Sequence, residues 1–145
     1  MVDPRNRVSY PMTLLAYIAG YKYQTQSHYR IYVGIHLTAN MQFLVLEGDG
    51  NLFIKSGYAW DGPSGPTFDT KNFIRASLVH DALYQLMREG YIPESYREHA
   101  DRLLQRMCIE DGMTAIRAWW VYKAVRFGGE KSAAFGSGKT IQYAP

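Results

Sequence analysis

Two spacings of apolar residues divide this chain, and the first of them predicts strands. Between residues 28 and 55, apolar and polar side chains alternate with a period of two, and glycine, asparagine and aspartate interrupt the runs. This alternation is typical of strands with one buried face, so we predict an antiparallel sheet of three or four strands. The segment GDGN at 48–51 predicts a tight hairpin turn, because Asp-Gly accepts a positive φ.

Beyond the strands the spacing changes to that of helices. In residues 72–90, apolar side chains recur three or four positions apart, as on one face of a helix, at Ala76, Val79, Leu83 and Leu86. A second helix should begin near Pro93 and end at Gly112, and a third should follow Thr114 and end at Gly128-Gly129. The short loop between the first two helices predicts that they pack antiparallel, as a helical hairpin.

These elements predict an α+β fold, with a small N-terminal antiparallel sheet followed by three packed helices. The 145 residues correspond to one domain. We place that domain at residues 28–129, between an N-terminal segment at 1–27 and a flexible C-terminal tail at 130–145. The apolar run at 11–20 is too short to span a bilayer, so we expect no transmembrane segment.

Composition narrows the classes of partner. The net charge is only +3 and the basic residues are scattered, so we do not expect nucleic acid as a partner. Cys108 is the only cysteine, which fits a reducing compartment or a particle assembled there. The simplest interpretation of Trp119 and Trp120 on the third helix is that they are core or interface anchors.

The first predicted helix carries the candidate chemistry. His80 and Tyr84 lie one turn apart at the edge of its apolar stripe, and Asp81 points further round the helix. If the helical hairpin forms, Asp101 on the second helix can approach His80. The simpler interpretation keeps His80 hydrogen-bonded in the core, with Asp81 paired to an arginine and Asp101 paired to Arg97 one turn before it.

A loop rich in glycine and proline, GYAWDGPSGP at 57–66, lies just before that helix. Gly57 and Gly62 allow the backbone to turn its carbonyls or amides inward, and Asp61 and Ser64 carry side-chain oxygens. Such a loop suits a cation or an oxyanion, and its simpler interpretation is a tight crossover.

Four motifs in a fixed order resemble one known family over roughly residues 28 to 129. They are Gly57-x-x-x-Asp61-Gly62-x-Ser64-x-Pro66, His80-Asp81-x-Leu83-Tyr84, Arg97-x-x-Ala100-Asp101 and the segment from Tyr122 to Gly128. Together they resemble a domain-of-unknown-function family, family 1353, that is common in phage and prophage genomes. The resemblance implies a phage association, and the family name itself brings no established activity.

The constellation His80-Asp81-x-x-Tyr84 with Asp101 also resembles the phospholipases A2. That resemblance implies that His80 takes a proton from water and that Asp101 with Tyr84 orients the imidazole. It implies further that Asp81 holds calcium together with carbonyls of the loop at 58–65.

Physically, a histidine of near-neutral pKa, a carboxylate that fixes its tautomer and a divalent cation suit hydrolysis. A variant of this site makes side chains direct ligands of zinc, manganese or calcium: His80, Asp61, and Asp81 or Asp101.

Two functional hypotheses follow. The first is a small metal-dependent hydrolase of a cell-envelope ester or amide, acting when a phage enters or leaves its host. The second is a non-enzymatic virion or tail component, in which the His-Asp network is structural and the partners are other phage structural proteins. Either protein would be made in the host cytoplasm and could be incorporated in the virion, and a homo-oligomer is left open.

Overall fold

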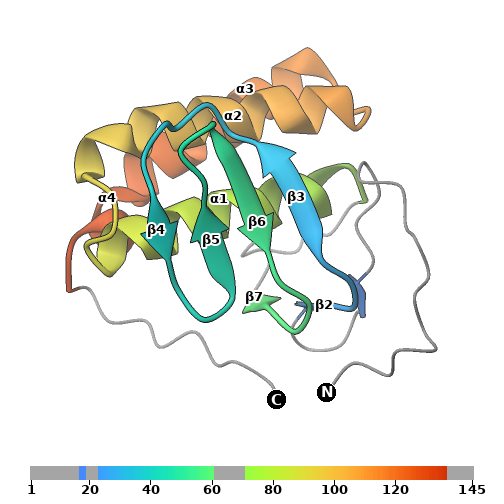
Figure 1. The fold of residues 1–145 in the computed structure, drawn as a ribbon. Helices are drawn as coiled ribbons and strands as arrows, with labels where there is room; N and C mark the ends of the chain where they lie inside the picture. Colours follow the sequence, from blue (N-terminus) through green and yellow to red (C-terminus); the bar gives the residue numbers. More distant parts are fainter. Residues whose placement is uncertain (1–16, 19–22, 61–70, 137–145) are drawn as a thin grey trace.

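A layer of strands packs against a layer of helices in the computed structural model, which describes residues 17–18, 23–60 and 71–136 (Figure 1). The strands are β1 (Tyr17–Ile18), β2 (Tyr23–Thr25), β3 (Tyr29–Tyr32), β4 (Ala39–Asn40), β5 (Leu44–Leu46), β6 (Asn51–Ile54) and β7 (Ala59–Trp60). The helices are α1 (Lys71–Arg88), a 3-10 turn (Glu94–Tyr96), α2 (Arg97–Glu110), α3 (Ala115–Gly128) and α4 (Glu130–Ala133). The predicted α+β class is confirmed.

The larger sheet has the strand order β3-β6-β5-β4, and all of its pairs are antiparallel. Its β5–β6 hairpin turns where the sequence predicts, and Gly50 there has a φ of +92°. Alternate residues of these two strands are buried in the core, namely Leu44, Leu46, Leu52 and Ile54. The period of two therefore predicts the buried face of this sheet correctly.

A second, smaller sheet has the order β1-β2-β7, and the sequence did not predict it. It pairs residues 23–25, which the sequence places in the N-terminal segment, with residues 59–60 just after the larger sheet. Strands of two or three residues are too short to display a period of two, so their pairing depends on tertiary contacts.

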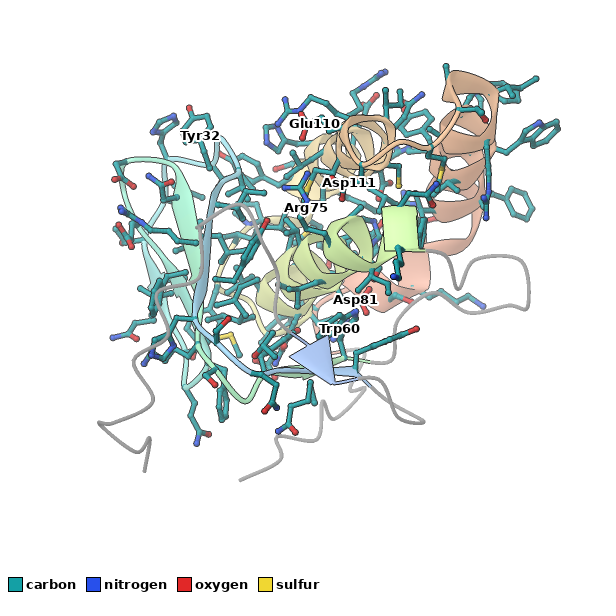
Figure 2. The ribbon with its side chains drawn as sticks, turned by 90° about the vertical axis from the view of Figure 1, so that its right-hand side faces the viewer. Tyr32, Trp60, Arg75, Asp81, Glu110 and Asp111 are labelled. Carbon is teal, nitrogen blue, oxygen red and sulfur yellow. The ribbon has the colours of Figure 1, made fainter. Side chains whose placement is uncertain are left out.

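Helix α1 is the central element of the helical layer. The apolar stripe predicted for it is buried, and so are Ile74 and Leu78 on its far side. The sheet lies on one side of α1 (Figure 2). Helices α2 and α4 also pack against α1. The predicted hairpin of α1 with α2 is present, and α3 lies beyond it at the edge of the molecule farthest from the sheet (Figure 2).

The tail differs from the prediction at its beginning. Residues 130–133 form α4, whose Ala133 is buried, and the amide of Gly136 donates a 2.8 Å hydrogen bond to the carbonyl of Arg88. The side chain of Glu94 accepts a hydrogen bond from the amide of Phe135. Long-range contacts order this segment, and a local pattern does not reveal them. Residues 137–145 of the predicted tail lie outside the described residues.

Within the described residues, no helix is long and apolar enough to cross a bilayer.

Candidate functional site

Helices α1 and α2 bring His80, Tyr84 and Asp101 into direct contact. Nε2 of His80 lies 2.7 Å from Oδ1 of Asp101, and the hydroxyl of Tyr84 donates a 2.6 Å hydrogen bond to the same oxygen. The rings of His80 and Tyr84 are 4.1 Å apart between centroids. This is the approach of Asp101 to His80 that the helical hairpin predicts.

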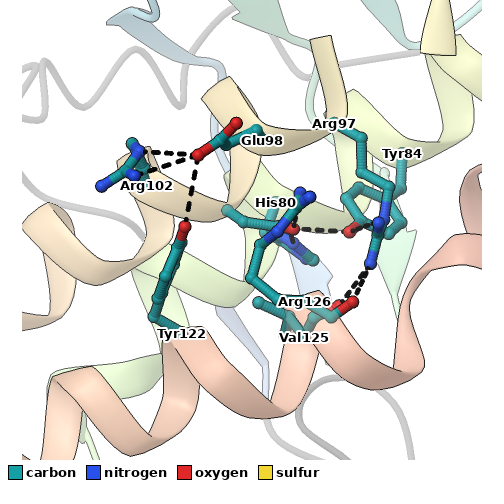
Figure 3. Close-up of polar contacts among 9 residues, drawn as sticks. His80, Tyr84, Arg97, Glu98, Arg102, Tyr122, Val125 and Arg126 are labelled. Atoms are coloured by element: carbon teal, nitrogen blue, oxygen red, sulfur yellow. Dashed lines mark hydrogen bonds and ion pairs between the residues drawn. The ribbon is translucent and has the colours of Figure 1, made fainter. Parts of the chain in front are cut away.

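The second oxygen of Asp101 is held from α3. Nη1 of Arg126 donates a 3.0 Å hydrogen bond to Oδ2 of Asp101. Figure 3 shows the side chain of Arg126 extending from α3 towards α2. Arg97, which the sequence offered as a partner for Asp101, instead donates from Nε to the hydroxyl of Tyr84 at 3.2 Å. Its Nη2 donates to the carbonyls of Val125 and Arg126 at the end of α3. Both arginines lie within the motifs quoted above, but sequence reasoning gave Arg126 no role.

Asp101 is fully buried and is ionised. Burial raises the pKa of this carboxyl, but hydrogen bonds from His80 and Tyr84 lower it more, so that the pKa lies below its ordinary value. Burial and the hydrogen bond to Asp101 raise the pKa of Tyr84, which keeps its hydroxyl protonated as a donor. Because an ionised carboxylate can only accept, Nε2 of His80 must carry a proton.

The other ring nitrogen of His80 faces a different acid. Nδ1 lies 4.0 Å from Oδ1 of Asp81, which is longer than a direct hydrogen bond and within the reach of a bridging water. The Asp81 side chain is 35% exposed, whereas His80 is only 8% exposed. The imidazole therefore has a buried, fixed side and a side directed at a solvent-facing carboxylate.

Two opposing effects set the charge of His80. Burial lowers the pKa of the imidazole, but the hydrogen bond to Asp101 and the neighbouring Asp81 raise it more, and the pKa ends above its ordinary value of 6.5. A neutral ring with its proton on Nε2 has its lone pair on Nδ1, so the nitrogen near Asp81 is the one able to accept a proton.

The predicted site residues are closer to the core than expected. The sequence placed His80 and Tyr84 at the edge of an apolar stripe, and both are buried. The hydrogen bonds from Arg97 to the end of α3 and from Arg126 to Asp101 explain this burial, because they hold α3 over that side of α1 and α2.

The predicted loop is only partly described. Asp61, Gly62 and Ser64 lie outside the described residues. Gly57 has a φ of +96°, its amide donates to the carbonyl of Thr25, and its own carbonyl accepts from the Gln24 side chain. Gly57 thus joins the turn before β7 to β2.

Metal binding has limited support from the described part of the chain. It contains no group of three or more His, Cys, Asp or Glu side chains placed to hold a metal ion. The oxygens of Asp101 are occupied by His80, Tyr84 and Arg126, so Asp101 is a poor candidate ligand. Among the predicted ligands that the structure describes, Asp81 is the one whose carboxylate is accessible.

The fold and the site define an α+β domain with a His-Asp-Tyr cluster between two antiparallel helices. Residues 36–125, more than half of the chain, match the family model described as "Protein of unknown function (DUF1353)". The chain belongs to this family, as its motifs suggested. The matched region includes His80, Tyr84 and Asp101 and ends one residue before Arg126. No curated protein and no solved structure matches the chain.

Proposed function

We propose that this protein is a small hydrolase of a cell-envelope ester or amide, with His80 as its general base. One observation supports this proposal most strongly. Asp101 holds Nε2 of His80 at 2.7 Å, while Nδ1 is directed at the solvent-facing Asp81. A base whose proton is fixed at one nitrogen, and whose other nitrogen faces a partly exposed carboxylate, is suited to general base catalysis.

In the proposed reaction, Nδ1 of His80 removes a proton from a water molecule as the water oxygen attacks the carbonyl carbon of the substrate. The resulting imidazolium is stabilised by the ionised Asp101, whose charge Tyr84 and Arg126 keep in place. The tetrahedral intermediate then expels the leaving group, and the imidazolium returns the proton to it. The products are a carboxylic acid and an alcohol or amine.

A divalent cation is part of the proposal, with calcium favoured over zinc. Asp81 offers an accessible carboxylate, and hard oxygen donors of this kind suit calcium. Asp61 and carbonyls of the loop at 57–66 would complete the site. Such an ion, when bound, would polarise the substrate carbonyl.

The biological setting in this proposal is a phage or prophage. It rests on the resemblance of the motifs to a family common in such genomes, and the envelope of the host cell is then the natural substrate.

The test compares four variants of the purified protein on soluble esters, phospholipid vesicles and peptidoglycan, with and without added calcium or zinc. We expect His80→Gln to lower kcat by roughly 10²-fold to 10⁴-fold, because it removes the base but keeps a similar shape. Asp101→Asn should lower kcat by permitting the wrong tautomer, and Asp81→Asn should weaken any dependence on the metal. Glu98→Gln, on the exposed side of α2, is the matched control.

Circular dichroism and urea unfolding of each variant separate loss of activity from loss of fold. Hydrolysis that His80→Gln leaves unchanged would overturn the proposal, as would a wild-type protein inactive on all three substrate classes with both metals present.

A second candidate is a non-enzymatic virion or tail component, and one observation favours it. His80 and Asp101 are buried, and every buried side-chain nitrogen or oxygen among the described residues has a hydrogen-bond partner. A satisfied network of this kind fixes helices against one another without any chemistry. This candidate predicts that His80→Gln lowers the free energy of unfolding and that no preparation hydrolyses any substrate.

A further inference from the structure

The outer face of α3 exposes large apolar side chains. Ile116, Trp120 and Phe127 follow one another at spacings of four and seven residues, which places them within about 40° on one side of a helix. Ile116 is 71% exposed and Phe127 is 96% exposed. Trp119, at the margin of this face, is also exposed and packs edge-on against Trp120. We call these four residues the α3 face.

The opposite side of α3 packs against the rest of the domain. Ala118, Val121 and Tyr122 are buried, and Tyr122 reaches Glu98 on α2 (Figure 3). The helix therefore already has a core-facing side, and the α3 face is a second apolar side. A contiguous apolar surface of this kind on a soluble domain usually marks an interaction site.

The charge of this region indicates the kind of partner. The segment at 115–133 contains four basic residues and one acidic residue, so its net charge of +3 equals that of the whole chain. Nζ of Lys123 lies 5.4 Å from the centre of the Trp119 ring, so a cation is placed within the apolar patch. The rest of the chain is neutral on balance. Within this segment Arg126 is paired with Asp101, whereas Lys123 remains beside the exposed aromatic residues.

A second copy of the chain fits this surface poorly. Two α3 faces meeting about a twofold axis would bring Lys123 of each copy towards a surface with the same positive excess, and α3 has no acidic residue to pair with it. A negatively charged surface is complementary. Exposed tryptophan beside lysine and arginine, on a helix that packs on a domain by its other side, is the composition of helices that lie in a membrane interface.

We propose that the α3 face binds the surface of an anionic lipid bilayer, with α3 lying in the plane of the interface. The helix has 14 residues and cannot cross a bilayer, so its place is on the surface. Ile116, Trp120 and Phe127 enter the boundary between headgroups and acyl chains, while Lys123 stays with the anionic headgroups. This binding goes beyond the proposed hydrolysis and does not depend on His80.

The test measures co-sedimentation of the purified full-length protein with vesicles of phosphatidylcholine, with and without phosphatidylglycerol. Tryptophan fluorescence provides a second readout, because Trp119 and Trp120 are exposed and should shift to the blue on binding, while Trp60 is buried already. We expect the wild-type protein to bind the anionic vesicles more tightly, and added salt to weaken that preference.

Two variants should reduce the binding in different ways. The double variant Trp120→Ser with Phe127→Ser should weaken binding to anionic vesicles more than about tenfold, since it removes two inserted side chains. Lys123→Ala should weaken it roughly fivefold, and only on the anionic vesicles. Ile109→Ser, which changes an exposed apolar residue of α2, is the matched control and should bind as the wild type does.

Three results would overturn the proposal. They are a wild-type protein that does not bind anionic vesicles, a double variant that binds them unchanged, and a wild-type dimer in analytical ultracentrifugation that the double variant converts to a monomer without any vesicle binding. His80→Gln should bind vesicles as the wild type does, so failure of the hydrolase proposal and failure of this one are distinguishable.

Discussion

Arg126 on α3 donates a 3.0 Å hydrogen bond to the carboxylate of Asp101 on α2. The same carboxylate accepts hydrogen bonds from His80 and Tyr84 on α1, so three helices meet at one fully buried negative charge. A buried carboxylate keeps its charge only where such partners replace water. The cluster is consequently a structural junction, and experiments on it need to separate this structural role from the proposed catalytic role of His80.

Substitution of Asp101 tests the structural role. Asp101→Asn leaves the shape of the side chain but removes the charge that faces His80 and Arg126. Breaking a buried ion pair leaves a buried charge without its counter-charge. We therefore expect a loss of about 3–5 kcal/mol in the free energy of unfolding, measured with urea. Glu98→Gln breaks the exposed pair with Arg102 and should lose no more than about 0.5 kcal/mol. Similar losses in the two variants would contradict this account.

The stability of the protein should depend on pH through His80. The folded pKa of His80 lies above its ordinary value of 6.5, so the folded state holds this proton more tightly than the unfolded state does. The resulting stabilisation is fully present below pH 6.5 and is lost as the pH rises through the folded pKa. Urea midpoints measured from about pH 6 to pH 9 should fall in the wild type. His80→Gln should abolish this part of the pH dependence. If the variant and the wild type show the same dependence of the urea midpoint on pH, a group other than His80 causes it.

Asp101 makes the converse contribution at acid pH. Its folded pKa lies below the ordinary value of 3.8, so its stabilisation is present above that pH and is lost as the pH falls through the folded pKa. The contribution of this cluster to stability should therefore be greatest at pH values between the folded pKa of Asp101 and the folded pKa of His80.

Gly129 lies where α3 ends over the ring of Tyr84. A Cβ at this position would lie 2.5 Å from the Tyr84 hydroxyl and 2.5 Å from the carbonyl of Val125, although the φ of −86° itself suits any residue. We expect Gly129→Ala to lose about 1–3 kcal/mol through this overlap. The neighbouring Gly128 has nothing within 4 Å of a Cβ, so Gly128→Ala should change the stability by less than about 0.5 kcal/mol. Urea unfolding measures both variants. Equal losses in the free energy of unfolding for Gly129→Ala and Gly128→Ala would contradict the close approach of Gly129 to Tyr84.

The sequence predicts what depends on neighbours along the chain. The stripe of α1, the hairpin at Gly50 and the start of α3 after Thr114 each follow from local patterns, and the structure has all three. The contact of Asp101 with His80 is also within reach of sequence reasoning, because a short loop forces α1 and α2 to run antiparallel.

What the sequence could not predict depends on packing between distant elements. The role of Arg126 depends on how α3 crosses α2, and no spacing within α3 sets that angle. Strands β2 and β7 are too short to show a period, and the segment at 130–136 is held by contacts with Arg88 and Glu94. The burial of His80 has the same origin, because α3 covers an edge that the sequence of α1 alone leaves open.

Substitution of Tyr84 separates the roles of the cluster most sharply. Its hydroxyl shares Oδ1 of Asp101 with His80, and Gly129 and Arg97 confine it. Tyr84→Phe keeps the ring but removes one donor from the carboxylate, so we expect a loss of about 1–2 kcal/mol in the free energy of unfolding. The carboxylate then accepts more strongly from His80, and the pKa of His80 should rise further. Asp101→Asn should move that pKa in the opposite direction, because the negative charge is gone. Titration of the His80 ring by NMR measures both shifts, and shifts of the same sign in the two variants would contradict the shared-oxygen geometry.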